Sequence, residues 1–187
     1  MTAAELMARL NADPRFVAER AARDAEFQRL DAALEQAETP LVEELRFAGF
    51  AVNSVWDLVN TAAPYVGALP ILFAHLQRPY PVPIREGIAR ALAVPEARSG
   101  WELLTRLFRE ERDRRAKDGL AVAIAEAADD TVIDDVIALV LDTQQGTSRG
   151  LLLSALARSR DPRAKAALSE LATDPDLNRE IRAIRRR

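Results

Sequence analysis

Ile84-Arg-Glu-Gly-Ile-Ala-Arg-Ala-Leu92 carries a pattern that returns twice along this chain of 187 residues. In each copy a basic residue stands seven positions before an aliphatic residue that lies between two alanines. The three copies follow one another at steps of 32 residues: Arg85 with Leu92, Lys117 with Ile124, and Arg149 with Leu156. A period of this length is typical of two-helix units that stack into a helical array. The sequence therefore predicts an all-α protein.

Helix start signals divide the chain into a helical extension and a series of helix pairs. Proline or aspartate stands where each pair begins, and Pro- or Gly-containing loops at 79–83 and 144–148 fall inside two of the pairs. We therefore expect an N-terminal extension or cap over residues 1–38 and a helical array over 39–187. The array would contain a degenerate unit at 39–63 and repeats at 64–94, 95–128, 129–159 and 160–187.

The N-terminal extension has clear capping signals. Thr2 and Glu5 have the spacing of a capping box, and Asp13 followed by Pro14 marks a second helix start. This second start predicts a long, charged amphipathic helix to about residue 38. Thr39-Pro40 repeats the signal, so we expect a new short helix there, ended by a left-handed turn at Gly49.

Composition narrows the classes of function. The chain has 26 basic and 29 acidic residues, a net charge of −3, one histidine and no cysteine. Without cysteine, and with His75 alone, the common thiolate and histidine metal clusters have no ligand set, so we expect neither metal nor cofactor. The mild acidity argues against nucleic acid as a partner, because phosphate binding draws on many Lys and Arg contacts. Without a signal peptide or membrane-spanning apolar run, we expect a cytoplasmic protein.

Two stretches resemble HEAT repeats. One is Ala68-Leu-Pro-Ile-Leu72 leading to the segment 84–92, and the other is the segment 161–171 leading to Asp174-Pro-Asp176. The resemblance covers residues 64–187 and implies a right-handed α-α superhelix, in which the second helices line a concave surface that holds a partner. The chain departs from the family pattern at Gln144-Gln-Gly, where an Asp-Pro turn is usual, and Pro70 has no counterpart in the later repeats.

The repeated basic residues are the first candidates for partner binding. Arg85, Lys117 and Arg149 would form a ladder along the inner surface that could receive an acidic peptide. The alternative is that each opens its helix and pairs with a neighbouring acid, such as Glu86 or Asp118.

Tyr80 is the fourth candidate. It stands between two prolines in a stiff turn, where an exposed ring would serve as a binding anchor. The alternative is that its ring packs across the adjacent repeat.

Other notable groups favour structural roles. Trp56 and Trp101 are expected in the core. The acidic pairs Asp129-Asp130 and Asp134-Asp135 are expected to cap helices rather than to bind metal or transfer protons, because adjacent helical residues point in different directions. The shared glycines Gly87 and Gly119 indicate close helix packing.

These observations favour a non-catalytic module that binds a protein or peptide, and not an enzyme. Two alternatives come by analogy with the family: a HEAT-like DNA glycosylase, for which Trp56-Asp57 or Trp101-Glu102 would be the reactive pair, and a HEAT-like chaperone of the bilin-lyase type. In a third interpretation the N-terminal helix either caps the array or docks onto a partner or second copy. Its docking face would contain Phe16, Phe27, Leu30 and Leu34. The oligomeric state stays open.

Overall fold

The computed structural model describes residues 2–186, which form α-helices, 3₁₀ helices and turns without any strand. The all-α class is therefore confirmed. The chain divides into two compact units, Met1–Thr39 and Pro40–Arg187. Within the described range no helix is both long and apolar enough to cross a membrane.

The first unit contains helix α1 (Ala3–Asn11) and most of helix α2 (Pro14–Phe47). Thr2 and Glu5 form the expected capping box: the Thr2 amide donates to the Glu5 carboxylate over 2.9 Å, and the Glu5 amide donates to the Thr2 hydroxyl over 3.3 Å. The carboxylate of Asp13 accepts from the amide of Arg15 over 2.9 Å and so caps α2. Both predicted helix starts are confirmed.

The predicted break at Thr39-Pro40 is wrong, because α2 runs through Pro40 without interruption. The Thr39 hydroxyl does not cap a new helix but donates to the carbonyl of Glu35 over 3.0 Å. A proline inside a helix costs about 3 kcal/mol. The turns that follow offset this cost, because Leu41, Val42 and Leu45 are buried in the second unit.

The end of α2 at Gly49 follows the prediction. Gly49 has a φ of +94°, which favours glycine, and the amide of Phe50 donates back to the carbonyl of Leu45 over 3.0 Å. A single turn, α3 (Trp56–Val59), follows after a loop. The carboxylate of Asp57 accepts from the amides of Asn53 and Ser54 and so caps this turn.

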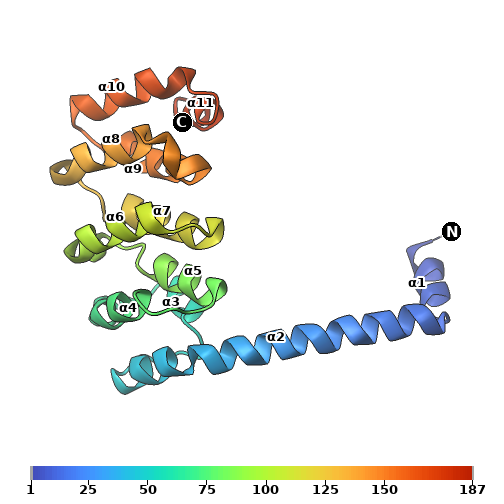
Figure 1. Ribbon diagram of the computed structural model, residues 1–187. Helices are drawn as coiled ribbons and strands as arrows, with labels where there is room; N and C mark the ends of the chain where they lie inside the picture. Colours follow the sequence, from blue (N-terminus) through green and yellow to red (C-terminus); the bar gives the residue numbers. More distant parts are fainter. Residues whose placement is uncertain (1, 187) are drawn as a thin grey trace. The chain divides into compact units, whose positions relative to one another are not determined.

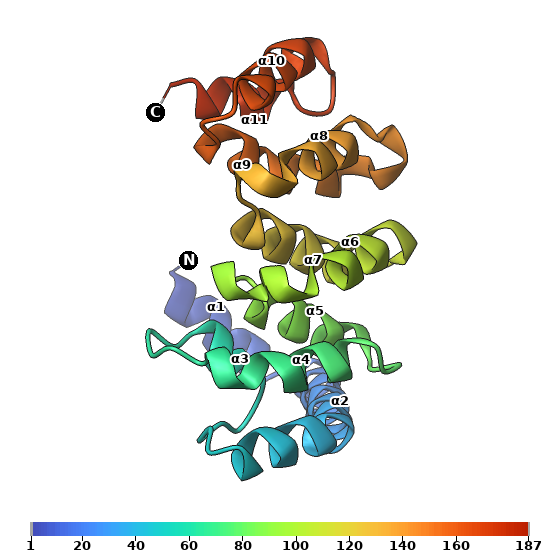
Figure 2. The ribbon, with the colours of Figure 1, turned by 90° about the vertical axis from the view of Figure 1, so that its left-hand side faces the viewer.

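Four helix pairs complete the second unit, and Figures 1 and 2 show them layered in chain order. Short 3₁₀ helices lead into the first helix of the first three pairs and open the second helix of the third pair. The pairs are α4 (Leu69–Leu76) with α5 (Val82–Ala91), α6 (Trp101–Glu110) with α7 (Arg114–Ala127), α8 (Ile133–Leu141) with α9 (Leu153–Arg158), and α10 (Pro162–Glu170) with α11 (Asn178–Ile184). The 3₁₀ helices are Val66–Ala68, Pro95–Gly100, Asp130–Val132, Thr143–Leu152 and Leu171–Thr173.

The repeated aliphatic residues form the middle of this stack. Leu92, Ile124 and Leu156 are almost completely buried, and so is the alanine before each of them. Small side chains at these positions let neighbouring second helices approach closely, while the aliphatic residues fill the space between layers.

The shared glycines lie where neighbouring elements approach one another closely. A Cβ atom on Gly87 would stand 2.5 Å from Cγ1 of Val55 and 3.0 Å from the indole nitrogen of Trp56. A Cβ atom on Gly119 would stand 3.1 Å from both the Glu86 carbonyl and the Ala89 methyl group. The predicted reason for these glycines, close helix packing, is confirmed.

Replacing Gly87 by alanine should therefore destabilise the protein. We expect the free energy of unfolding, measured by chemical denaturation, to fall by about 1–3 kcal/mol, because Val55 and Trp56 must shift. Gly67→Ala is the matched control, since its Cβ would make an ordinary contact of 3.4 Å with Phe50. Equal stabilities of the two variants would contradict this account of the packing.

Candidate partner-binding site

The first and third basic residues of the ladder reach from the start of one second helix to the turn of the next pair. Arg85 forms an ion pair with Glu111, which precedes α7. Arg149 donates to the carboxylate of Asp174 over 2.8 Å and lies 3.4 Å from that of Asp176. These contacts tie successive helix pairs together at their turns.

Arg149 is the most deeply buried charged group of the ladder. Its side chain is 1% exposed, and its guanidinium also donates to the carbonyl of Val140 over 3.0 Å. Its Nε atom has no hydrogen-bond partner among the described residues. Burial raises the pKa of Asp174, but the hydrogen bond and charge of Arg149 outweigh this and hold that pKa below its ordinary value.

Lys117 occupies the same position in the middle copy but reaches backward. Its ammonium group donates to the carbonyl of Glu111 over 3.3 Å and lies 5.0 Å from the centre of the Phe108 ring. Burial lowers the pKa of Lys117, and the negative charges of Asp142 and Glu111 only partly counter this. The cation is therefore held less firmly than Arg149.

The acids expected to pair with the ladder bind other residues. Glu86 accepts from Arg90 and Arg115, each over 3.0 Å, and Asp118 lies 3.8 Å from Arg114. The predicted neighbour pairing with Glu86 or Asp118 is thus wrong. Arg85 and Arg149 instead find acids 25 to 27 residues further along the chain, because the stacking of pairs brings successive turns together.

Tyr80 packs within its own helix pair. Its hydroxyl lies 2.7 Å from Nδ1 of His75, and the two rings stack with centroids 5.8 Å apart. Nε2 of the fully buried His75 lies 2.8 Å from the carboxylate of Glu44. In the tautomer with its proton on Nε2, His75 donates to Glu44 and accepts from Tyr80. The ring of Tyr80 is half-buried and held in place by these contacts.

Two adjoining hollows follow the turns of the first three pairs, and we call them together the turn groove. The first, of about 550 Å³, is lined by Leu76, Tyr80, Arg85, Leu107, Arg112 and Leu120, among others. The second, of about 820 Å³, is lined by Arg109, Arg112, Arg114, Lys117, Gln144 and Thr147, among others. Both share the turn residues 110–112. The turn groove thus unites three of the four predicted partner-binding residues and leaves out the buried Arg149.

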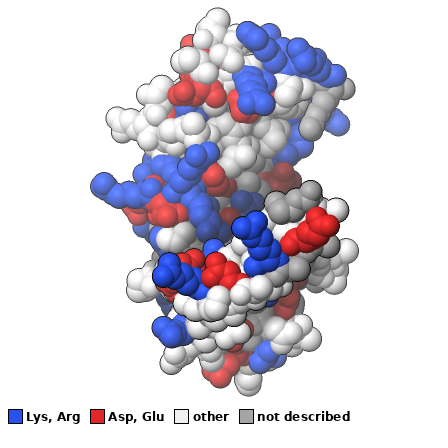
Figure 3. All heavy atoms as spheres, turned by 90° about the vertical axis from the view of Figure 1, so that its right-hand side faces the viewer, with Lys and Arg blue, Asp and Glu red and all other residues white. Residues whose placement is uncertain are grey.

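The turn groove also has cations that sequence reasoning did not single out. Among residues 2–186 the guanidinium of Arg112 forms no ion pair or hydrogen bond, and that of Arg109 makes only a 3.5 Å contact with the Thr105 carbonyl. The acid Glu111 is already engaged by Arg85 and by the amides of residues 112 and 113. Figure 3, which views the side of the second helices, shows acidic and basic side chains interspersed there. Arg112 and Arg109 therefore line the groove without an ion pair of their own.

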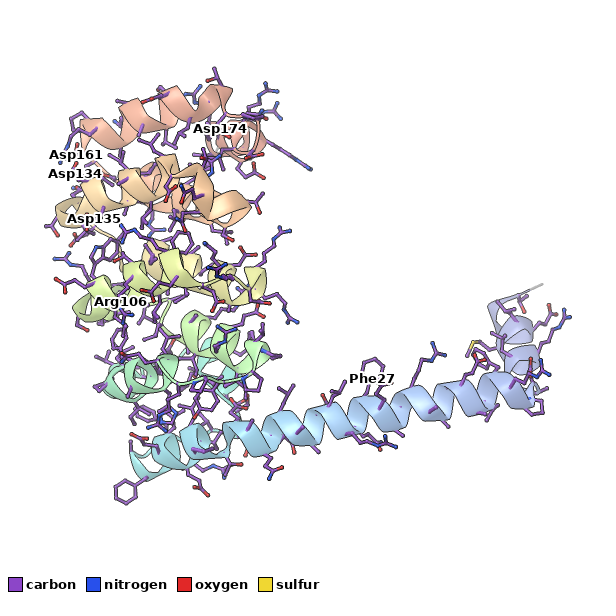
Figure 4. All side chains as sticks on the ribbon, viewed as in Figure 1. Phe27, Arg106, Asp134, Asp135, Asp161 and Asp174 are labelled. Atoms are coloured by element: carbon purple, nitrogen blue, oxygen red, sulfur yellow. The ribbon has the colours of Figure 1, made fainter. Side chains whose placement is uncertain are left out.

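The acidic pairs just before and at the start of α8 tie helix pairs together. Asp129 caps the 3₁₀ helix that follows it and forms an ion pair with Arg98. Asp134 binds Arg163 over 2.6 Å, and Asp135 accepts from the indole of Trp101 over 2.8 Å. Figure 4 shows Asp134 and Asp135 along one edge of the stack, close to Asp161.

Hydrogen bonds from Arg163 lower the pKa of Asp161 to about 2. Residues 2–186 contain no group of three or more His, Asp or Glu side chains placed to hold a metal ion. The sequence predicted that the acidic pairs cap helices. Asp129 does so, whereas Asp134 and Asp135 bind side chains of other helix pairs.

Comparison with known proteins adds no assignment. No protein-family model, no curated protein and no solved structure matches this chain. The site is therefore argued from its own residues.

The Arg149–Asp174 contact predicts a pH-dependent contribution to stability. Because the pKa of Asp174 is lowered in the folded state, this contribution is present above the ordinary pKa near 4 and is lost as the pH falls through the folded value. Arg149→Met should lower the free energy of unfolding at pH 7 by about 3–5 kcal/mol, since it leaves buried acceptors unpaired. The difference from the unmodified protein should narrow below about pH 4.

Denaturant unfolding at several pH values measures this difference. Arg160→Met is the control, because Arg160 is exposed and only its backbone amide forms a hydrogen bond, to Asp130. A difference between Arg149→Met and the unmodified protein that stayed constant from pH 7 to pH 3 would show that the charge of Asp174 does not contribute.

Proposed function

We propose that this protein is a non-catalytic, cytoplasmic interaction module, a HEAT-like right-handed superhelix that binds a protein segment in the turn groove. The observation that supports this most directly is the composition of the groove. Leucine and tyrosine side chains line it together with four arginines, Arg85, Arg109, Arg112 and Arg114, of which Arg109 and Arg112 form no ion pair among the described residues. The acids that also line it, Glu110 and Glu111, are paired with Arg106 and Arg85. A surface that offers apolar contact together with free guanidinium groups suits an amphipathic acidic segment.

Lys117 gives a physical reason for an acidic partner. Its pKa is lowered because burial removes water without supplying a full counter-charge. A carboxylate bound nearby would stabilise the charged ammonium, so binding and protonation of Lys117 would favour each other. Arg112 would gain an ion pair that it does not have within the chain.

The extent of the groove favours a peptide over a small molecule. The two hollows adjoin along the turns of three successive helix pairs, and each is as large as a typical small-molecule site. An extended chain could follow them from Tyr80 to the loop at 144–148. Arrays of this kind commonly bind extended partners along one continuous surface.

We prefer this function to that of a HEAT-like DNA glycosylase because of how the candidate reactive residues are used. Asp57 accepts two backbone amides as a cap, and Trp101 donates its indole proton to Asp135. Neither side chain is available without loss of a structural contact. Within the described residues we find no feature that favours a bilin-lyase-type chaperone.

Selection of random peptides displayed on phage tests the proposal. We expect enriched peptides to carry several acidic residues beside a large apolar one, and to bind more weakly as salt is added. Arg112→Glu should weaken the binding of an enriched peptide by about tenfold or more, mainly through slower association.

Arg160→Glu is the matched control, since it makes the same charge change at an exposed arginine outside the groove. Titration by fluorescence anisotropy compares the variants, and thermal unfolding should be unchanged in both. Enrichment of basic or uncharged peptides, or equal effects of the two substitutions, would refute the turn groove as the binding site.

A further inference from the structure

The second hollow of the turn groove gathers basic side chains that have no acid to bind. Four of them line it: Arg109 from the end of α6, Arg112 from the turn, and Arg114 and Lys117 from the first turn of α7. Among residues 2–186, Arg109, Arg112 and Lys117 form no ion pair, and Arg114 makes only a 3.8 Å contact with Asp118. The hollow therefore holds positive charge that the described chain does not pair.

The acids that line this hollow are bound to other residues. Glu110 is paired with Arg106 over 3.3 Å, and Arg106 does not line the hollow. Glu111 is paired with Arg85, which lines the first hollow, and it also accepts from backbone amides of the turn. Neither acid therefore neutralises the unpaired cations directly.

Asp142 also lies near the hollow, just before the loop at 144–148. Its carboxylate accepts from the Gln145 side chain over 2.6 Å and from the Gln144 amide over 3.0 Å, and these hydrogen bonds lower its pKa. The charges of Arg109 and Lys117 lower that pKa further, although Asp142 forms an ion pair with neither of them in the described chain. Asp142 is thus held by its own loop and leaves both cations without a direct partner.

The loop at 144–148 supplies polar groups to the same hollow, at the place where the chain departs from the usual Asp-Pro turn. Gly146 has a φ of +63°, a conformation that favours glycine and shapes the loop. The hydroxyl of Thr147 is exposed and forms no hydrogen bond within residues 2–186. A free hydroxyl donor therefore lines the hollow together with the unpaired cations.

We propose that this hollow binds the phosphate group of a phosphoserine or phosphothreonine within the acidic segment, an inference that rests on the proposed function of the turn groove. A phosphate monoester carries nearly two negative charges at pH 7 and three strong acceptor oxygens, whereas a carboxylate has one charge and two oxygens. Two guanidinium groups and an ammonium group without ion pairs match the phosphate better. Arg109 and Arg112 are exposed, so a short phosphorylated side chain can reach them.

The first hollow favours a protein segment over nucleic acid as the source of this phosphate. Leu76, Leu107 and Leu120 line it beside Tyr80, which suits an apolar side chain near the phosphorylated residue. A nucleic-acid backbone would draw on cations repeated along the surface. The repeated cation of the third helix pair, Arg149, is instead buried and paired.

A library of synthetic peptides with one fixed phosphoserine between random positions tests the inference on the full chain. An enriched peptide is then made in phosphoserine, glutamate and serine forms, and fluorescence anisotropy gives the Kd of each. We expect the phosphoserine form to bind about tenfold more tightly than the glutamate form, because it adds at least one charged hydrogen bond. This advantage should shrink between about pH 7 and pH 5.5, since the phosphate gains a proton near pH 6.

Substitutions in the hollow show whether the phosphate is bound there. Arg109→Gln combined with Arg112→Gln should reduce the preference for phosphoserine over glutamate to about twofold or less. Arg160→Gln combined with Arg179→Gln is the matched control, because both arginines are exposed and neither lines the groove. We expect the control to keep the preference, and thermal unfolding to be unchanged in both double variants.

Three outcomes would overturn the phosphate site while leaving the turn groove to its own test. The first is equal affinity for the phosphoserine and glutamate forms. The second is a preference that persists in Arg109→Gln with Arg112→Gln, which would mean that the phosphate binds elsewhere. The third is displacement of the phosphopeptide by duplex DNA at an equal concentration of phosphate, which would show recognition of a nucleic-acid backbone. If neither the phosphorylated nor the acidic peptides bind, the proposed function itself is refuted, and the phosphate site with it.

Discussion

The contact on which the second unit depends is the reach of a basic side chain from one helix pair to the turn of the next. Arg85 does this with Glu111, and Arg149 does it with Asp174 from a position that is 1% exposed. A buried guanidinium destabilises the fold unless its N–H donors are paired. The turn that supplies the acceptors must therefore lie where those donors point. The packed aliphatic residues hold the layers together, and these ion pairs add specific contacts at two of the junctions between helix pairs.

This constraint explains why Arg149, the third residue of the ladder, does not line the turn groove. Arg149 is buried and already paired with acids of its own chain, so its guanidinium is not accessible to a partner. Arg112 and Arg109 stand next to the engaged Arg85 and Glu111, and they have no such partners. The repeated residues Arg85 and Arg149 thus bind the turns of the next helix pairs. Arg109 and Arg112, which are not part of the repeat, supply the positive charge that is not paired.

Local signals were the most reliable part of the sequence. Thr2 and Asp13 cap helices as their spacing predicts, because a side-chain oxygen can satisfy an amide two or three residues away in any tertiary context. The same local rule failed at Thr39-Pro40, where packing of the following turns outweighs the cost of proline inside α2. The sequence could not predict that Arg109 and Arg112 form no ion pair, because being unpaired depends on which acids other residues have already bound.

By itself the sequence determined the helical class, the period of the layers and the close approaches at Gly87 and Gly119, since these follow from spacing and side-chain size. Only the tertiary structure decided the partner of each charge. Arg85 lies next to Glu86 in the chain yet pairs with Glu111, and Tyr80 turns its hydroxyl to His75. The physical reason is that an ion pair or hydrogen bond forms with whatever the stacking of helices brings within about 3 Å. At the turns of the stacked helix pairs, residues roughly one repeat apart come into contact, although nothing in their local sequence identifies them as partners.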